Sequence, residues 1–257
     1  MSENPYENSE AAPAATGKHK AAAFGCTSVW AVVTFAVAAL VAIAVVMLLP
    51  MFARSRVIGQ QYQCKQNLDR LMTAMHAYND DHGHFPPAFT TDEDGRRLHS
   101  WRTLLLPYLD QKSLYQSIDL RKPWDDPANA LARGVTLKVF VCPAAELEPG
   151  LTTYKGLVGP TAFFPDDGST RTTDNMVTSK TLAIVEVSPE RAVHWMDPAH
   201  EDGVDFLLKR YKASDTSHFA VPGVCADGSS INISRSADEE DLKSLLDIGN
   251  SVEETDD

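Results

Sequence analysis

The feature that most constrains this chain is an uncharged run of more than thirty residues, Ala21 to Ala53. A hydrocarbon core about 30 Å thick is crossed by roughly 20 apolar helical residues, and Val29–Leu49 has that length. A cleavable signal peptide has a shorter apolar run and a small-residue cleavage site, whereas Pro50-Met51-Phe52 follows this one. We therefore predict a retained single-pass anchor, with a cleaved signal and a buried soluble helix as the alternatives.

The charges beside this run do not fix its orientation. Lys18 and Lys20 precede it, and Arg54 and Arg56 follow it, so the comparison of basic flanks is nearly balanced. Residues 1–20 carry no core-forming residues, and we expect them to be a disordered tail.

The composition after the anchor indicates one domain of about 200 residues. The formal net charge of the chain is −12, which argues against nucleic-acid binding. Much of the excess lies in residues 238–257, with nine acids against one lysine. We interpret this stretch as a solvated, partly helical tail, with a cation or partner contact as the alternative.

The helix is expected to continue beyond the membrane-length run, to about Asp80. Leu68, Leu71, Met72 and Met75 recur at helical spacing between polar residues, so one face of this second half should pack on a domain. The segment DHGHFPP, with its glycine and two prolines, should stop the helix.

The rest of the chain favours an α+β fold, in which the long helix packs on an antiparallel sheet. We expect HSWRTLLLPYLDQKSLYQSIDL to be helical, and RKPWDDPAN and TAFFPDDGST to be loops. The runs VTLKVFVCP, TLAIVEV and DGVDFLLKRY are predicted strands. In VCADGSSINIS, Asp227-Gly228 should form a tight hairpin turn between two strands.

Four stretches, in order, resemble the DUF1559 family: QCKQNLDRLMTAMHAYNDDHGHFPPA, the HSWRTLLLPYLDQ stretch with PWDDPAN, FVCPA, and HFAVPGVCADGSSINIS. The similarity covers roughly Phe52 to Ser234. These are pilin-like proteins of planctomycete-type bacteria, also named prepilin-type proteins for a histidine ahead of an Asp-Gly pair. That family motif corresponds here to His218, Asp227 and Gly228. The resemblance implies a pilin-like fold, a cytoplasmic N-terminus and an exported domain.

Two features depart from the family pattern. FGCTSVWAVV lacks the glutamate of a prepilin cleavage motif and has a cysteine where phenylalanine is expected, so we expect cleavage to be lost. Eight residues rather than nine separate His218 from Asp227. We accordingly divide the chain into a tail (1–20), a transmembrane helix (21–53), a pilin-like extracytoplasmic domain (54–237) and an acidic tail (238–257).

No metal or cofactor site is expected, but three groups of residues are weighed as candidates. His76, His82 and His84, with Asp80 and Asp81 beside them, have the donor types of a zinc site, although the sequence favours a helix-capping role for His82 and His84. His194, Asp197 and His200 could bind a metal or form an acid–base pair; the alternative interpretation is that they belong to an exposed polar loop. Calcium could bind loop carboxylates, chiefly Asp166 and Asp167, together with Asp174, Asp125 and Asp126. Trp101 and Trp124 are expected to anchor the core rather than bind sugar.

The cysteines leave the disulfide pairing open. Cys26 belongs to the apolar run, so Cys64, Cys142 and Cys225 remain for the domain. A Cys64–Cys142 bridge would fasten the long helix to the first predicted strand, and Cys142–Cys225 is the rival.

The sequence predicts a membrane-anchored, pilin-like envelope protein with a structural, assembly or scaffolding role and no catalysis. Its expected partners are membrane lipid and other pilin-like or secretion components. The alternative is a membrane-tethered ligand-binding module or a metal-dependent hydrolase that uses the histidine and aspartate clusters.

Overall fold

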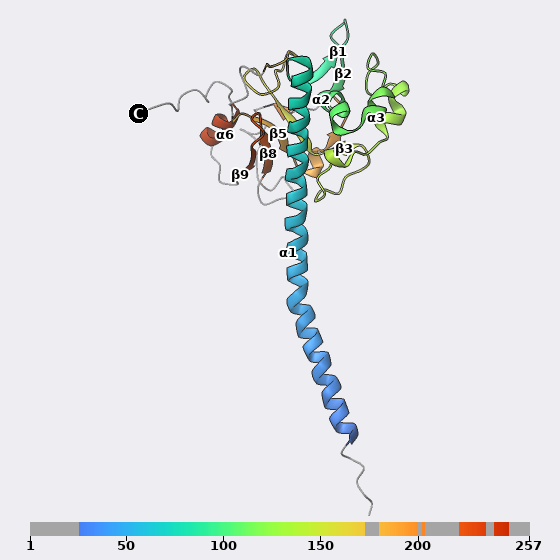
Figure 1. Ribbon diagram of the computed structural model, residues 1–257, viewed down its shortest axis with the longest axis vertical. Coiled ribbons are helices and arrows are strands. Elements are labelled where there is room, and N and C mark those ends of the chain that lie inside the picture. The colour runs from blue at the N-terminus through green and yellow to red at the C-terminus, as the bar shows by residue number, and fades with distance from the viewer. Residues whose placement is uncertain (1–25, 173–179, 200–201, 204–220, 235–238, 247–257) are drawn as a thin grey trace, which may run out of the picture. The chain divides into compact units, whose positions relative to one another are not determined.

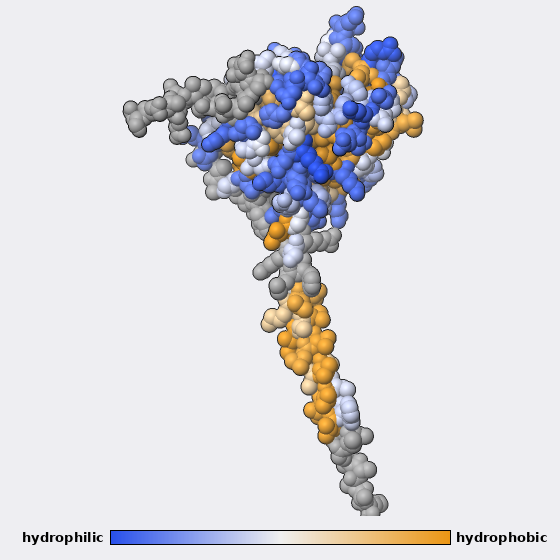
Figure 2. Space-filling view, in the orientation of Figure 1, coloured by the Kyte–Doolittle hydropathy of each residue, from blue (hydrophilic) through white to orange (hydrophobic). Residues whose placement is uncertain are grey.

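A computed structural model of the chain describes residues 26–172, 180–199, 202–203, 221–234 and 239–246 (Figure 1). It divides into two compact units, Met1–Ala53 and Arg54–Asp257, and the helix α1 (Cys26–His82) contributes to both. Within the first unit, Val29–Leu49 is long and apolar enough to cross a membrane, and none of it is buried. Figure 2 shows the hydrophobic surface of this part of α1. A signal sequence near the N-terminus can also satisfy this test of length and composition, so these properties establish a membrane-length helix and no topology.

The second unit mixes short helices with antiparallel sheet, as expected for an α+β fold. A small hairpin, β1 (Phe89–Thr91) and β2 (Arg97–Ser100), follows α1. The short helices are α2 (Trp101–Leu104), η1 (Leu106–Leu109), α3 (Lys112–Gln116), η2 (Pro127–Asn129), α4 (Ala130–Arg133), η3 (Lys138–Phe140), η5 (Pro189–Arg191) and α6 (Glu239–Leu246). β3 (Leu151–Thr152) pairs with β6 (Val193–His194).

The main sheet has five strands in the order β7-β4-β5-β8-β9. These are β7 (Asp202–Gly203), β4 (Tyr154–Val158), β5 (Leu182–Glu186), β8 (Val221–Cys225) and β9 (Ser230–Ile233). All the pairings are antiparallel, as expected from the sequence, except that between β4 and the two-residue strand β7, which is parallel. The predicted strand TLAIVEV is β5, and Asp227-Gly228 makes the predicted turn between β8 and β9.

The two faces of the sheet bury different cores. Because strand side chains alternate between faces, Ile184 and Val224 point into a core that α1 completes with Leu68, Met72 and Met75. A second, smaller core takes the other face of β5, β8 and β9, and α6 covers it with Leu242. The stripe predicted at helical spacing on α1 is therefore the helix's buried face, with Leu68, Leu71, Met72 and Met75 at most 1% exposed.

Two predicted elements are wrong. The run VTLKVFVCP forms no strand: it contains η3, because its carbonyls find a partner on α1 rather than on a neighbouring strand. The Nδ2 atom of Asn67 donates to the carbonyls of Lys138 and Val141, at 3.2 and 3.0 Å. The segment that begins at His99 is not helical from its start, because His99 and Ser100 end β2. The Ser100 hydroxyl then caps α2 by accepting from the amide of Arg102.

The chain leaves α1 at a glycine turn. Gly83 has φ of +75°, a conformation that glycine adopts without strain, and its amide donates to the carbonyl of Asn79. The helix thus ends at His82, within the segment expected to stop it. Most of the DGVDFLLKRY run lies outside the described residues, which include only β7 from it.

Candidate functional site

The side of α1 in the second unit is covalently joined to the segment that follows η3. Cys64 and Cys142 form a disulfide with their Cα atoms 5.0 Å apart, and Cys225 is a free, buried cysteine. Of the two pairings that the sequence leaves open, the structure contains the one between helix and domain. Gln60 adds a hydrogen bond from Nε2 to the carbonyl of Pro143 at 3.0 Å. The disulfide, together with the amide side chains of Gln60 and Asn67, fixes α1 against the segment after η3, and a groove lies between them.

That groove is a cleft of about 490 Å³. It is lined by Gln63, Gln66, Asn67, Arg70, Lys138, Val141 and Pro143. Two of the lining side chains are cationic and none is a carboxylate, although the whole chain carries a net charge of −12. A volume of this size is in the range of small-molecule sites. The cleft could therefore accept an anionic ligand.

Arg102 is fully buried in the second unit. Its guanidinium donates to the carbonyl of Tyr154 from both Nε and Nη2, and to the hydroxyl of Ser100 from Nη1. That hydroxyl in turn donates to the carbonyl of Trp195. A buried cation needs such partners, and here they connect α2, β4 and the chain after β6. The sequence interpretation missed Arg102, although one arginine inside the apolar run from Trp101 to Leu106 is a visible signal.

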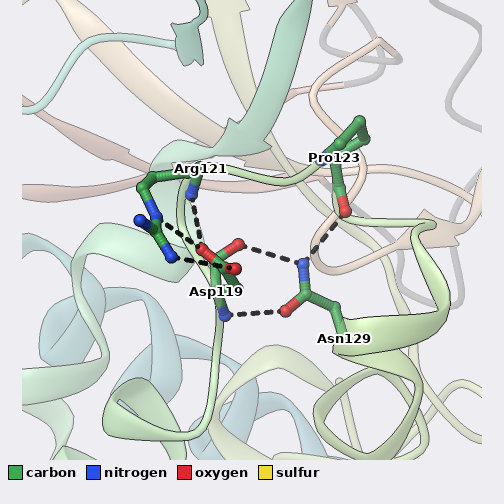
Figure 3. Close-up of polar contacts among 4 residues, drawn as sticks. All are labelled: Asp119, Arg121, Pro123 and Asn129. Atoms are coloured by element: carbon green, nitrogen blue, oxygen red, sulfur yellow. Dashed lines mark hydrogen bonds and ion pairs between the residues drawn. The ribbon is translucent and has the colours of Figure 1, made fainter.

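Asn129 organises the PWDDPAN stretch (Figure 3). The side chain is fully buried, and its Oδ1 accepts from the amide of Asp119 at 2.8 Å. Its Nδ2 donates to the carbonyls of Asp119 and Pro123, at 3.2 and 3.0 Å. Arg121 contacts the Asp119 carboxylate from the outside, at 3.2 Å. Its guanidinium and backbone amide lower the pKa of Asp119. These contacts close a loop and present no reactive group to a substrate.

Histidine and tyrosine rings gather where α1 ends. The ring of Tyr78 stacks on that of His82, with centroids 4.0 Å apart, and Tyr108 meets Tyr78 edge-on. The hydroxyl of Tyr108 donates to Asp81 at 2.9 Å. Desolvation and this carboxylate raise the pKa of Tyr108 to about 12, so the phenol stays protonated at neutral pH. His82 Nδ1 lies 2.9 Å from the carbonyl of Tyr78, which is the capping contact weighed from sequence.

The cluster of His194 and Asp197 is not the exposed polar loop that sequence favoured as its explanation. His194 is half-buried in β6, and its ring stacks on Trp124 at 4.8 Å. Nε2 lies 3.0 Å from the carbonyl of Arg133, and Nδ1 accepts from the amide of Met196. Both ring nitrogens therefore have backbone partners, and desolvation lowers the pKa of His194. His200 lies outside the described residues.

The calcium candidates do not come together as one site in the described part of the chain. Asp166 and Asp167 are exposed, and Asp167 Oδ1 accepts from the amide of Ser169, as a turn residue does. Asp126 caps η2 through the amide of Ala128. Asp174 lies outside the described residues. Among those described, three potential ligands come close together only at Cys64, Cys142 and Glu186, and two of these form the disulfide.

The family motif is only partly described. Asp227 and Gly228 lie at the β8–β9 turn, where Asp227 Oδ1 accepts from the amide of Ser229 and Gly228 has φ of +84°. This geometry is that of a turn that needs glycine. His218 lies outside the described residues. Trp101 is fully buried and Trp124 packs on the same core, as expected for core anchors.

Fold and sequence together define a class: an α+β domain preceded by an apolar helix long enough to span a membrane. The chain belongs to the DUF1559 family, described as proteins of unknown function, whose family model matches residues 60–230. The matched region covers the buried stripe of α1, the disulfide, the PWDDPAN loop and most of the β8–β9 hairpin. No curated protein and no solved structure matches the chain.

Proposed function

We propose that this protein is a single-pass, pilin-like envelope protein whose role is structural and not catalytic. The observation that carries the proposal is the double use of α1. Its first part, Val29–Leu49, buries none of its apolar surface within the protein. Its later part supplies the buried stripe of the domain core. A helix of this kind ties a folded domain to a bilayer.

Three polar side chains that bind backbone carbonyls support a structural role. Asn67, Arg102 and Asn129 direct their side chains at backbone carbonyls and bring distant segments together. Groups committed in this way stabilise the architecture, whereas a catalytic group needs an open face toward its substrate. Their chemistry supports scaffolding.

We further propose a cytoplasmic N-terminus and an exported domain. The Cys64–Cys142 disulfide supports this orientation, because disulfides persist in oxidising compartments and are rare in the cytosol. An exported domain on a retained helix would meet membrane lipid and neighbouring pilin-like or secretion components.

The test uses the full chain, expressed in a diderm bacterium and separated into soluble and membrane fractions. We expect the protein in the membrane fraction after alkaline extraction, with an N-terminal mass that retains Val29–Leu49. Protease added to spheroplasts should digest the domain. A double variant with Val37→Glu and Val41→Glu should lose membrane retention, because each charge is costly at the bilayer centre. The matched variant with Val37→Leu and Val41→Leu should keep it. A processed, soluble domain would overturn the proposal.

The cleft along α1 favours one second candidate, a membrane-tethered ligand-binding module. Arg70 and Lys138 line this cleft and no carboxylate does, and the Cys64–Cys142 disulfide joins the two segments that form it. These are the features of a preorganised anion site. A screen of carboxylate and phosphate compounds by thermal shift tests this candidate. Stabilisation should be lost on Arg70→Ser and kept on Arg133→Ser, which changes a cation outside the cleft lining. The hydrolase version of this alternative has less support, since His194 already has partners on both ring nitrogens.

A further inference from the structure

The end of α1 carries two histidines whose rings are held beside each other. His82 is the last residue of the helix, Gly83 turns the chain with φ of +75°, and His84 follows. The two ring centroids lie 6.2 Å apart with their planes tilted by 54°. His82 is exposed and His84 is half-buried, so solvent reaches this pair.

Hydrogen bonding fixes the tautomer of both rings. Nδ1 of His82 lies 2.9 Å from the carbonyl of Tyr78, and Nδ1 of His84 lies 2.9 Å from the carbonyl of Phe85. A carbonyl oxygen only accepts, so Nδ1 carries the proton in each ring. Each neutral ring therefore has its free lone pair on Nε2, and no described residue donates to either Nε2. Histidines that bind metals are oriented in this way, with the second nitrogen donating to a backbone carbonyl or carboxylate.

The other described histidines lack this arrangement. His194 engages both nitrogens with backbone groups, as described above. His99 is fully buried, without access for an ion. His76 packs edge-on against Phe85, and no carbonyl contact like those of His82 and His84 anchors its ring. Among the described residues, an anchored Nδ1 and an accessible Nε2 occur together only at His82 and His84.

The surroundings favour a cation. Asp80 and Asp81 precede His82 in the last turn of the helix, and the C-terminal end of a helix carries partial negative charge. Both aspartates line a neighbouring cleft of about 440 Å³ together with Tyr108. Tyr78 stacks flat on His82 and restricts rotation of its ring. The ligands thus lie beside two carboxylates, although Lys112 also lines the neighbouring cleft.

We propose that His82 and His84 form a two-histidine site for a borderline divalent transition-metal ion of the Zn²⁺ or Cu²⁺ class, bound through both Nε2 atoms and completed by water. With metal–nitrogen bonds of about 2.1 Å and ring centroids roughly 1.1 Å beyond the nitrogen, two imidazoles on one ion have centroids about 5.3 Å apart at the tetrahedral angle and about 6.5 Å apart when they lie opposite each other. The observed separation of 6.2 Å lies between these values, nearer the wide angle, and a small rotation of either ring brings the pair to the tetrahedral arrangement. Imidazole nitrogen selects zinc, copper and nickel over magnesium and calcium. The ion would tie the last turn of α1 to the loop that leads into β1.

The experiment titrates the full chain in detergent micelles with Zn²⁺ by calorimetry, and with Cu²⁺ by electron paramagnetic resonance. We expect one high-affinity equivalent, nitrogen hyperfine structure from two imidazoles, and no heat with Ca²⁺. The single variants His82→Gln and His84→Gln should each weaken binding at least tenfold. The matched variant His76→Gln, six residues before His82 on the same helix, should bind as the parent does.

Two further measurements distinguish loss of the metal site from loss of folding in a destabilised variant. Circular dichroism and the intact Cys64–Cys142 disulfide report whether each variant is folded. Tyr108→Phe removes a hydroxyl beside His82 and leaves both ligands in place, so it should retain the metal. Equal stoichiometry and affinity in the folded double variant His82→Gln/His84→Gln would overturn the site, since the ion would then be held elsewhere.

Discussion

Asn129 and Asp119, ten residues apart, hold each other through two reciprocal hydrogen bonds. The amide of Asp119 donates to Asn129 Oδ1, and Asn129 Nδ2 donates to the carbonyl of Asp119 and to that of Pro123. A single buried side chain thereby joins three backbone groups of this loop, in addition to the turn hydrogen bonds that the amides of Lys122 and Asp126 donate to the carbonyls of Asp119 and Pro123. The same stretch places Trp124 on β2, whose Leu98 carbonyl accepts from the amide of Trp124.

Asn129→Ala should therefore destabilise the protein. It leaves the half-buried amide of Asp119 without its partner and removes one of the two hydrogen bonds to the carbonyl of Pro123, which still accepts from the amide of Asp126; the loss costs about 1–3 kcal/mol. Urea unfolding of the full chain in detergent, followed by tryptophan fluorescence, measures the loss. Arg121→Ala is the matched control on the same loop: its ion pair is at the surface, and the unfolding midpoint should stay unchanged. Equal effects of the two variants would contradict the role given to Asn129.

The sequence predicted those elements whose structure depends on local pattern. The helical stripe of Leu68 and Met72, the strand at Leu182–Glu186 and the Asp227-Gly228 turn each follow from the residues within them. The predicted secondary structure was wrong where a residue distant in the sequence determines the local conformation. The VTLKVFVCP run alternates like a strand, but Asn67, some seventy residues earlier, takes up its carbonyls.

The candidate sites follow the same division. The capping role of His82 could be predicted, because its partner Tyr78 lies four residues away. The environment of His194 could not, since its partner carbonyl belongs to Arg133 and its stacking partner is Trp124. Arg102 was missed for the same reason, because Tyr154 lies 52 residues further on. Long-range partners are set by tertiary structure, which no local pattern specifies.

Loss of the disulfide should cost more than loss of any single hydrogen bond. The bridge closes a loop across a sequence separation of 78 residues. In the chain-entropy description such a loop stabilises the folded state by about 4.5 kcal/mol, through restriction of the unfolded chain. The double variant Cys64→Ser/Cys142→Ser should therefore show a lower unfolding free energy in urea, by about 2–5 kcal/mol.

Cys225→Ala is the control for this double variant. Cys225 is buried, and desolvation raises the pKa of its thiol to about 11, so it stays protonated and unreactive in the folded protein. Its replacement by alanine removes one buried sulfur and no cross-link, and it should lower stability less. Peptide mapping without reductant should recover a Cys64–Cys142 peptide pair. A Cys142–Cys225 pair would contradict the structure.

Stability should fall as the pH drops through the range of histidine titration. Desolvation lowers the pKa of His99, and the nearby backbone of Lys122 and Asp119 opposes this shift only in part. The unfolded chain then takes up a proton near pH 6.5 while the folded protein still holds His99 neutral. Its contribution is complete above pH 7 and is lost progressively below about 6.5, by at most about 1.4 kcal/mol per pH unit.

Thermal unfolding of the full chain from pH 8 to pH 5 tests this dependence. His99→Gln removes the titrating ring, and the slope below pH 6.5 should become shallower, whatever the variant does to stability at pH 8. His194 titrates in the same direction, so some slope should persist. A variant with the parent slope would show that another group is responsible.

Two glycines in the second unit should respond oppositely to alanine. A Cβ on Gly156 in β4 would lie 2.6 Å from the Phe164 ring and 3.0 Å from Trp101 Nε1, between two buried aromatic side chains that stack on each other. Neither ring can withdraw without disturbing the core around Arg102, whose guanidinium lies 4.5 Å from the Trp101 ring centroid. Gly156→Ala should therefore cost about 1–3 kcal/mol.

Gly59 in α1 has no atom within 4 Å of a built Cβ, and alanine there should gain up to about 1 kcal/mol of helix stability. Urea unfolding of both variants in one detergent separates the effects. A neutral Gly156→Ala would mean that the Trp101–Phe164 contact is looser in solution than its 5.6 Å centroid separation implies.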